Sequence, residues 1–166
     1  MKRGLFIGRF QPLHLGHLKD IKDALKEVDE LIIGIGSSNE KLTRKNPFSA
    51  EERIEMINLA LQKHGIKKYK IFEIPDFHDD KKWVDYVEEN IPKFDIVYTG
   101  NEWTERCFKS RGYSIKKVKI LEDISSTIIR SMMANNKDWQ SLVPGEIADF
   151  LNSMNGVKKI KDIYKN

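Results

Sequence analysis

Residues 4–17 read GLFIGRFQPLHLGH, an apolar run followed at once by a segment containing histidine and glycine. The run Gly4–Gly8 predicts a buried strand because it is short, apolar and bounded by glycine. The residues after it lead into an amphipathic pattern that predicts a helix over about 14–28. The chain therefore begins with a strand, a turn and a helix.

The same alternation continues along the chain. Further strands are predicted at 31–36, 70–74, 95–99 and 116–121, and further helices at about 49–64, 81–91, 101–111, 126–135 and 143–154. This pattern favours a doubly wound, Rossmann-like α/β fold, with a parallel sheet of about five strands and flanking helices. We expect a single domain over residues 1–166, with the C-terminal helical segment at about 138–166 packed on it. Ligands bind beyond the carboxyl ends of such strands, here the loops after residues 8, 36, 75, 99 and 121.

The charge composition suits a small anionic ligand. The 166 residues carry a formal net charge of +4, from 29 Lys and Arg against 25 Asp and Glu. Neither sign forms a block, so the sequence predicts no nucleic-acid binding. We expect no membrane span and no signal peptide, because the apolar runs are too short. The single cysteine, Cys107, excludes an intramolecular disulfide framework and fits a cytoplasmic protein.

The segment Gly8–His17 has the composition of an anion site. Backbone N–H groups and the positive end of a helix dipole meet at a strand-to-helix junction. His14 and His17 would share a helix face and offer imidazole N–H donors and positive charge to phosphate oxygens. Gly16 lets a phosphate chain approach the backbone, and Arg9 adds a permanent charge. Paired histidines also suit a metal, but no third ligand lies nearby and Arg9 would repel a cation.

A second candidate phosphate segment reads ISSTIIR and covers residues 124–130. It leads into the helix predicted at about 126–135, where Ser125, Ser126 and Thr127 are natural N-cap residues. Capping explains the hydroxyl groups but not Arg130, which follows three residues after Thr127. In the functional interpretation, the hydroxyls and free N–H groups hold phosphate oxygens while Arg130 neutralises their charge.

Two common nucleotide-binding motifs are excluded. The run Gly34–Gly36 imitates the start of a GxGxxG fingerprint, but Asn39 stands at the third glycine position and a polar stretch follows. We interpret this run as a tight turn at a strand end, beside the expected phosphate ligand. The sequence contains no Gly-Lys dipeptide, which excludes the GxxxxGK phosphate loop.

The two phosphate segments resemble the motifs of one superfamily, the HxGH nucleotidylyltransferases. The sequence GRFQPLHLGH at residues 8–17 narrows the resemblance to the archaeal-type nicotinamide mononucleotide (NMN) adenylyltransferases. ISSTIIR is similar to the superfamily's ISSTxIR motif, and the resemblance runs the length of the chain. It implies transfer of AMP from ATP to NMN, with NAD and pyrophosphate as the products.

The resemblance also assigns roles to single residues. His14, His17 and Arg130 are the implied catalytic residues. The implied ATP site comprises Gly8, Arg9, Phe10, His14, Gly16, His17, Lys45, Ser125, Ser126, Thr127 and Arg130. Similar enzymes have an arginine in place of Lys45, so Lys45 and Arg44 remain alternatives for one phosphate contact.

The implied NMN site comprises Trp83, Asn101 and Asp76. In similar enzymes the tryptophan of this helix stacks on the nicotinamide ring. From the pattern alone Trp83 is equally well a core residue of an amphipathic helix. Asn101 is equally well the N-cap of the helix that follows it.

The implied cofactor is Mg²⁺, held mainly by triphosphate oxygens and water, with no protein ligand for a metal. Related archaeal enzymes are commonly hexamers, so we expect a homo-oligomer. Two alternative functions stay open. One is another HxGH transferase, such as a phosphopantetheine adenylyltransferase or a cytidylyltransferase, and the other is a noncatalytic nucleotide-binding sensor.

Overall fold

Five parallel strands form the centre of the computed structural model, which describes residues 1–119, 121 and 123–166. They are β1 (Arg3–Gly8), β2 (Glu30–Ile35), β3 (Tyr69–Glu73), β4 (Ile96–Thr99) and β5 (Ser114–Lys117). Their order across the sheet is β3-β2-β1-β4-β5. The direction of winding reverses between β1 and β4, which opens a crevice at the carboxyl ends of those strands. The predicted doubly wound α/β fold is confirmed.

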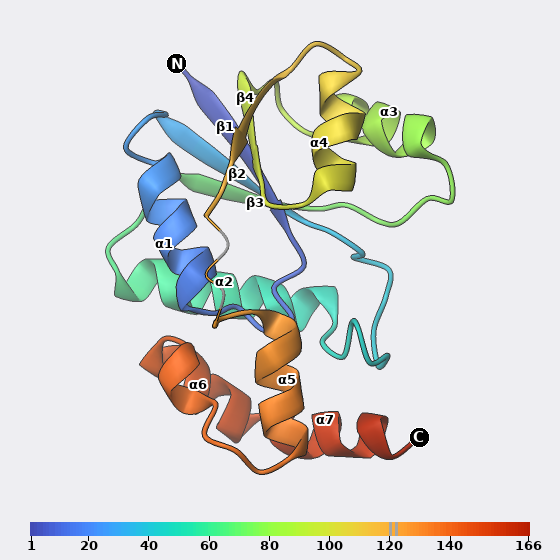
Figure 1. Cartoon of the computed structure of the whole chain (residues 1–166). Coiled ribbons are helices and arrows are strands. Elements are labelled where there is room, and N and C mark those ends of the chain that lie inside the picture. Colours follow the sequence, from blue (N-terminus) through green and yellow to red (C-terminus); the bar gives the residue numbers. More distant parts are fainter. Residues whose placement is uncertain (120, 122) are drawn as a thin grey trace.

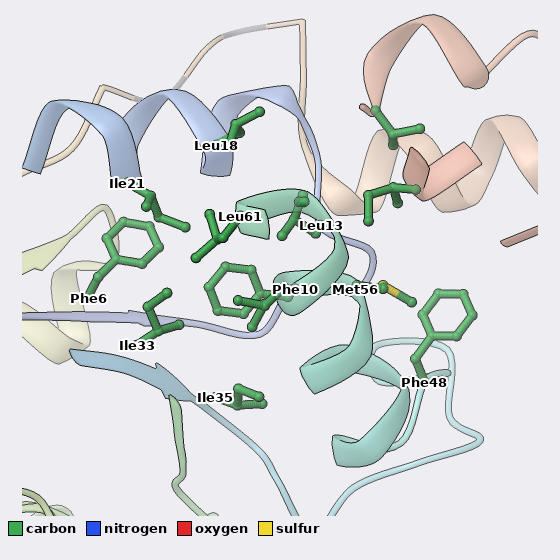
Figure 2. Close-up of a cluster of buried hydrophobic side chains, with 14 of the residues drawn as sticks. Phe6, Phe10, Leu13, Leu18, Ile21, Ile33, Ile35, Phe48, Met56 and Leu61 are labelled. Carbon is green, nitrogen blue, oxygen red and sulfur yellow. The ribbon is translucent and has the colours of Figure 1, made fainter. Parts of the chain in front are cut away.

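Helices cover both faces of the sheet (Figure 1). One face carries α1 (Leu15–Ala24) and α2 (Ala50–Lys63), and the other carries α3 (Asp80–Asn90) and α4 (Glu102–Lys109). Successive strand residues point to opposite faces. Phe6 and Ile33 therefore pack with α1 and α2, as Figure 2 shows, whereas Leu5 and Ile32 pack with α3 and α4.

The C-terminal part adds α5 (Ser126–Ala134), a 3₁₀ turn (Gln140–Leu142), α6 (Gly145–Ser153) and α7 (Gly156–Lys165). Helix α6 packs on α2, and α7 packs on α5 and α6. Their buried residues Ile147, Leu151 and Ile160 continue the core that α1 and α2 form with the sheet. Helix α7 was not predicted as a separate element. Asn155 adopts a left-handed conformation with φ 56°, which ends one helix and redirects the chain into the next.

Two predicted boundaries were wrong. Strand β5 covers Ser114–Lys117 rather than 116–121, because it pairs residue by residue with the four-residue strand β4 and the ladder ends at Thr99 and Lys117. Ile120 of the predicted range lies outside the described residues. Helix α1 ends at Ala24 rather than near residue 28. In the described ranges, no helix combines the length and apolar character that crossing a bilayer requires.

Candidate functional site

Two cavities meet at the carboxyl end of β1. The histidine cavity has a volume of about 200 Å³ and is lined by residues that include Gly8, His14, Gly16, His17 and Ser125. The tryptophan cavity has a volume of about 420 Å³. Its lining includes Gly8, Arg9, Asp76, Trp83 and Asn101. Because Ile7 and Gly8 line both cavities, ligands bound in the two would approach each other at this strand end.

His14 and His17 form a capping box at the start of α1. The Nδ1 atom of His14 accepts hydrogen bonds from the backbone N–H groups of Gly16 (3.1 Å) and His17 (3.3 Å). The Nδ1 atom of His17 accepts in turn from the backbone N–H of His14, at 3.1 Å. A neutral imidazole whose Nδ1 is an acceptor carries its proton on Nε2. Each histidine therefore keeps one Nε2–H donor for a ligand.

The histidine pair is uncharged in the free protein at neutral pH. Burial lowers the pKa of His14 from 6.5 to about 4. Burial lowers the pKa of His17 well below 6.5, and the neighbouring His14 lowers it further. The two rings stack with their centroids 3.7 Å apart, so a charge on one disfavours a charge on the other. In the free protein these residues are therefore neutral hydrogen-bond donors. The positive charge that the sequence predicts for them beside a phosphate ligand stays a prediction.

Gly16 is required by the histidine box itself. A Cβ atom at this position would lie 2.9 Å from Cε1 and 3.0 Å from Nδ1 of the His14 ring. From the sequence, we expected the missing side chain to leave room for a phosphate chain beside the backbone. The structure shows that the ring of His14 takes up this space, although Gly16 also lines the histidine cavity.

The low pKa of His14 predicts a specific dependence of stability on pH. Between about pH 6.5 and pH 4 the unfolded chain binds a proton at this histidine that the folded chain excludes, so stability falls as the pH falls. The loss amounts to about 3 kcal/mol at pH 4. Urea denaturation at a series of pH values measures it.

The matched control is His14→Asn, because the Asn Oδ1 atom can accept the same backbone hydrogen bonds but does not titrate. Carboxyl groups such as Asp20, whose pKa burial raises to about 6, titrate in both proteins, so the difference between them isolates His14. Equal slopes in the two proteins would contradict the buried, neutral histidine.

The tryptophan cavity brings together the three residues predicted for the second substrate. Trp83 is 3% exposed and packs against Trp103 at 4.6 Å between ring centroids. Trp83 belongs to the core cluster, so the core interpretation is confirmed. It also lines the cavity, and its contact with the second substrate stays a prediction. Asn101 likewise has two roles: its Oδ1 accepts from the backbone N–H of Thr104 at 3.0 Å as the N-cap of α4, and the residue lines the cavity. The exposed Asp76 accepts a hydrogen bond from Ser37 at 3.1 Å.

Residues 124–130 lie beside the histidine cavity but contribute unequally to it. Ser125 lines the cavity and caps α5, its Oγ accepting from the backbone N–H of Ile128 at 3.1 Å. Ser126 donates its hydroxyl to the carbonyl of Pro12, at 2.9 Å. Thr127 is exposed and lies 3.5 Å from a guanidinium nitrogen of Arg130. Ser126 and Thr127 do not line the cavity, so the structure brings only Ser125 of the three hydroxyl residues to it.

Arg130 is 4% exposed. Its Nη1 donates to the carbonyl of Gln11 at 2.8 Å, and its Nε has no hydrogen-bond partner among the described residues. Burial lowers its pKa, an effect opposed by contact with the hydroxyl of Tyr164. Arg130 thus connects α5 to the turn after β1, and it lines neither cavity.

Phe10 and Lys45, both predicted for the ATP site, line neither cavity. Phe10 is 1% exposed and packs its ring on His17, with the centroids 4.7 Å apart, so it supports the histidine box from the core. Lys45 is exposed on the loop between β2 and α2. Its alternative, Arg44, donates to the backbone carbonyl of Tyr164 at 2.7 Å. Since Arg44 is held in this way, Lys45 is the better candidate for a phosphate contact.

Arg53 supports the site from the core, a role that was not predicted from the sequence. It is 0% exposed in α2, and its guanidinium donates to the backbone carbonyls of Ser49, Arg9, Gly36 and Ser37 at 2.7–3.2 Å. Burial lowers its pKa to about 10, so it stays charged at neutral pH. Through these hydrogen bonds Arg53 links the turn after β1 to the turn after β2. The sequence did contain one indication of this role. Arg53 lies one turn into a helix that follows a loop containing proline.

Comparison with known proteins agrees with this geometry. The family model described as cytidylyltransferase-like matches residues 5–132. The nicotinamide-nucleotide adenylyltransferase of Pyrococcus furiosus is 41% identical and that of Thermococcus sibiricus is 44% identical. The alignments cover 100% and 99% of this chain, and 91% and 92% of those relatives.

A solved structure is also similar. It is a bifunctional NMN adenylyltransferase/ADP ribose pyrophosphatase of Francisella tularensis, complexed with AMP and a Mn ion, with a TM-score of 0.82 and 26% identity. The similarity covers 98% of this chain and 51% of that one, so this chain spans about half of the bifunctional enzyme. The chain belongs to the cytidylyltransferase-like family.

Proposed function

We infer that the chain is a nicotinamide-nucleotide adenylyltransferase, which transfers the adenylyl group of ATP to NMN and forms NAD and pyrophosphate. The observation that carries this inference is the histidine capping box at the point where two cavities meet. Relatives of that name, 41–44% identical over nearly the whole chain, support the choice of both substrates. The function belongs to NAD biosynthesis.

The reaction needs no protein nucleophile. An oxygen of the NMN phosphate attacks the α-phosphorus of ATP and forms the new P–O bond. The bond from the α-phosphorus to the oxygen that bridges to the β-phosphorus breaks, and pyrophosphate leaves with that electron pair. The protein contributes orientation and hydrogen-bond donors aimed at the developing charge.

We assign ATP to the histidine cavity and NMN to the tryptophan cavity. The Nε2–H groups of His14 and His17 donate to oxygens of the α-phosphate, which places the reacting phosphorus near Gly8. Arg9 is exposed at the end of β1 and lines the tryptophan cavity, where it can pair with either phosphate. Arg130 and Lys45 serve the β- and γ-phosphates, while Ser125 and the backbone at the start of α5 add donors.

Mg²⁺ is proposed as the cofactor. Within the described residues, no group of three or more His, Cys, Asp or Glu side chains is placed to hold a metal ion. We propose that the ion enters bound to triphosphate oxygens and water, which suits the strongly hydrated Mg²⁺ ion. Bound in that way, it neutralises part of the phosphate charge.

A homo-oligomer and a cytoplasmic location complete the proposal. The oligomer is supported by the resemblance to archaeal enzymes that are commonly hexamers, and light scattering of the purified protein tests it. The location is supported by the single cysteine, which suits a reducing compartment.

Substitution of Trp83 tests the acceptor. The indole face is electron-rich and the pyridinium ring of NMN is cationic, so stacking is favourable. Trp83→Phe keeps most of the apolar volume but offers a smaller face, and it should raise the KM for NMN by about fivefold while the KM for ATP stays the same. Steady-state kinetics with each substrate varied in turn measures the two constants.

The matched control is Trp139→Phe. Trp139 is also 3% exposed, but it lies in the other core cluster and lines neither cavity. Equal changes in both KM values, or similar kinetics for the two variants, would show that Trp83 acts only through packing.

The proposed function is tested directly by supplying pairs of donor and acceptor. We expect NAD from ATP plus NMN, detected by mass spectrometry together with pyrophosphate release. A product from phosphopantetheine or from CTP, with none from NMN, would instead support another transferase of the superfamily. Tight ATP binding without release of pyrophosphate with any acceptor would support the nucleotide sensor.

A further inference from the structure

Helix α7 reaches back to the loop that carries Lys45. Lys159, in the middle of α7, pairs with Glu52 of α2 at 2.5 Å. The same ammonium group lies 5.8 Å from the ring centroid of Phe48, where the loop enters α2. The second end of the loop is therefore fixed to α7 by charge and by a cation–π contact.

Tyr164, near the end of α7, holds the first part of the loop. Arg44 donates from Nη2 to the backbone carbonyl of Tyr164 at 2.7 Å. Its guanidinium also lies over the Tyr164 ring, 5.1 Å from the centroid. A guanidinium held by both a carbonyl and a ring face has little freedom, and the next residue in the chain is Lys45.

Helix α7 packs on α5, the helix that carries Arg130. The Tyr164 hydroxyl lies near enough to raise the pKa of Arg130 against the effect of burial. Arg130 is almost fully buried and is anchored by the carbonyl of Gln11, next to the histidine box. One tyrosine thus holds an arginine of the basic loop and lies near an arginine of the motif at residues 124–130.

We propose that Tyr164 is a positioning residue of the ATP site, which fixes Arg44, and with it the loop carrying Lys45, relative to Arg130. The inference rests on the proposed function. Arg44, Lys45 and Arg130 line neither cavity. Because the proposed function gives Lys45 and Arg130 the β- and γ-phosphates, Tyr164 acts on the phosphates that leave as pyrophosphate and not on the acceptor.

The test compares Tyr164→Ala with Tyr164→Phe. Tyr164→Ala removes both the ring under Arg44 and the hydroxyl at Arg130. It should raise the Kd and KM for ATP, and the KM for pyrophosphate in the reverse reaction, by about five- to tenfold. The KM values for NMN and NAD should not change. Both variants keep the backbone carbonyl that Arg44 binds, but Tyr164→Phe also keeps the ring under Arg44 and should restore most of the ATP affinity.

Two further variants separate positioning from folding. Lys158→Ala removes an exposed ion pair to Asp162 on the same helix and should leave all constants unchanged. Arg44→Ala should weaken ATP binding as Tyr164→Ala does, and the double variant should lose less than the product of the two single effects. Titration calorimetry with ATP alone gives the Kd, so the role of Tyr164 is tested even if no NAD forms. A failure to form NAD would contradict the proposed function and not the role of Tyr164.

An unchanged Kd for ATP in a folded Tyr164→Ala variant, or equal changes for both substrates, would overturn the role proposed for Tyr164.

Discussion

His17→Asn should lower kcat by about a hundred- to a thousandfold, the effect of losing one preorganised donor worth ~2.7–4 kcal/mol in the transition state. The Asn Oδ1 atom can replace Nδ1 as the acceptor of the His14 backbone N–H, so the start of α1 is kept. The Nε2–H donor is lost, together with the ring contacts to His14 and Phe10. The KM for ATP should change much less than kcat, because the donor acts on charge that develops during the reaction.

The complementary variant is His17→Gln, whose longer side chain brings an amide N–H near the position of Nε2 but gives up the Nδ1 acceptor. We expect it to recover part of kcat and to lose thermal stability, the reverse of the pattern for Asn. Stopped assays of NAD formation and thermal melts of the three proteins provide the comparison. Near-normal turnover in a folded Asn variant would remove His17 from catalysis.

Arg53→Met should destabilise the protein by ~3–5 kcal/mol. The methionine fills a similar apolar volume, but it leaves the part-buried carbonyl of Arg9 and the buried carbonyl of Gly36 without the donor that they have at 3.1 and 2.7 Å. Both carbonyls belong to turns that line the tryptophan cavity, so substrate affinity should fall as well. The midpoint of urea denaturation and the KM for NMN measure the two effects.

Arg106→Met is the control, since Arg106 is exposed on α4. Surface substitutions of this kind change stability by about 0.5 kcal/mol or less. If Arg53→Met lowers the free energy of unfolding by no more than this control, the four hydrogen bonds to carbonyls do not hold the two turns together.

The sheet could be predicted from the sequence because its strands are short, apolar and β-branched. The runs at residues 4–8 and 31–36 gave the centre of the sheet almost to the residue. The last strand was misplaced by two residues at its start and four at its end, since its limits depend on the length of β4 beside it rather than on its own composition. Helix α7 depends on a left-handed turn at Asn155, which the apolar pattern does not specify.

The site was predictable where one residue type carries the chemistry. The positions of His14, His17, Trp83 and Asn101 followed from motifs, and the structure brings them to two adjoining cavities. The charge state of the histidines did not follow, because it depends on burial by distant segments. The roles of Arg53 and Tyr164 were not predicted for a similar reason. Arg53 binds backbone carbonyls and Tyr164 binds a cation, and these partners are distant in the sequence.

The central claim is that the chain transfers the adenylyl group, and ATP labelled with ³²P tests it most directly. With the label at the α-phosphorus, incubation with NMN should carry radioactivity into NAD. With the label at the γ-phosphorus, it should appear in pyrophosphate and none in NAD. Transfer of the γ-label to the acceptor, or an α-label that ends in ADP or free AMP, would contradict the claim.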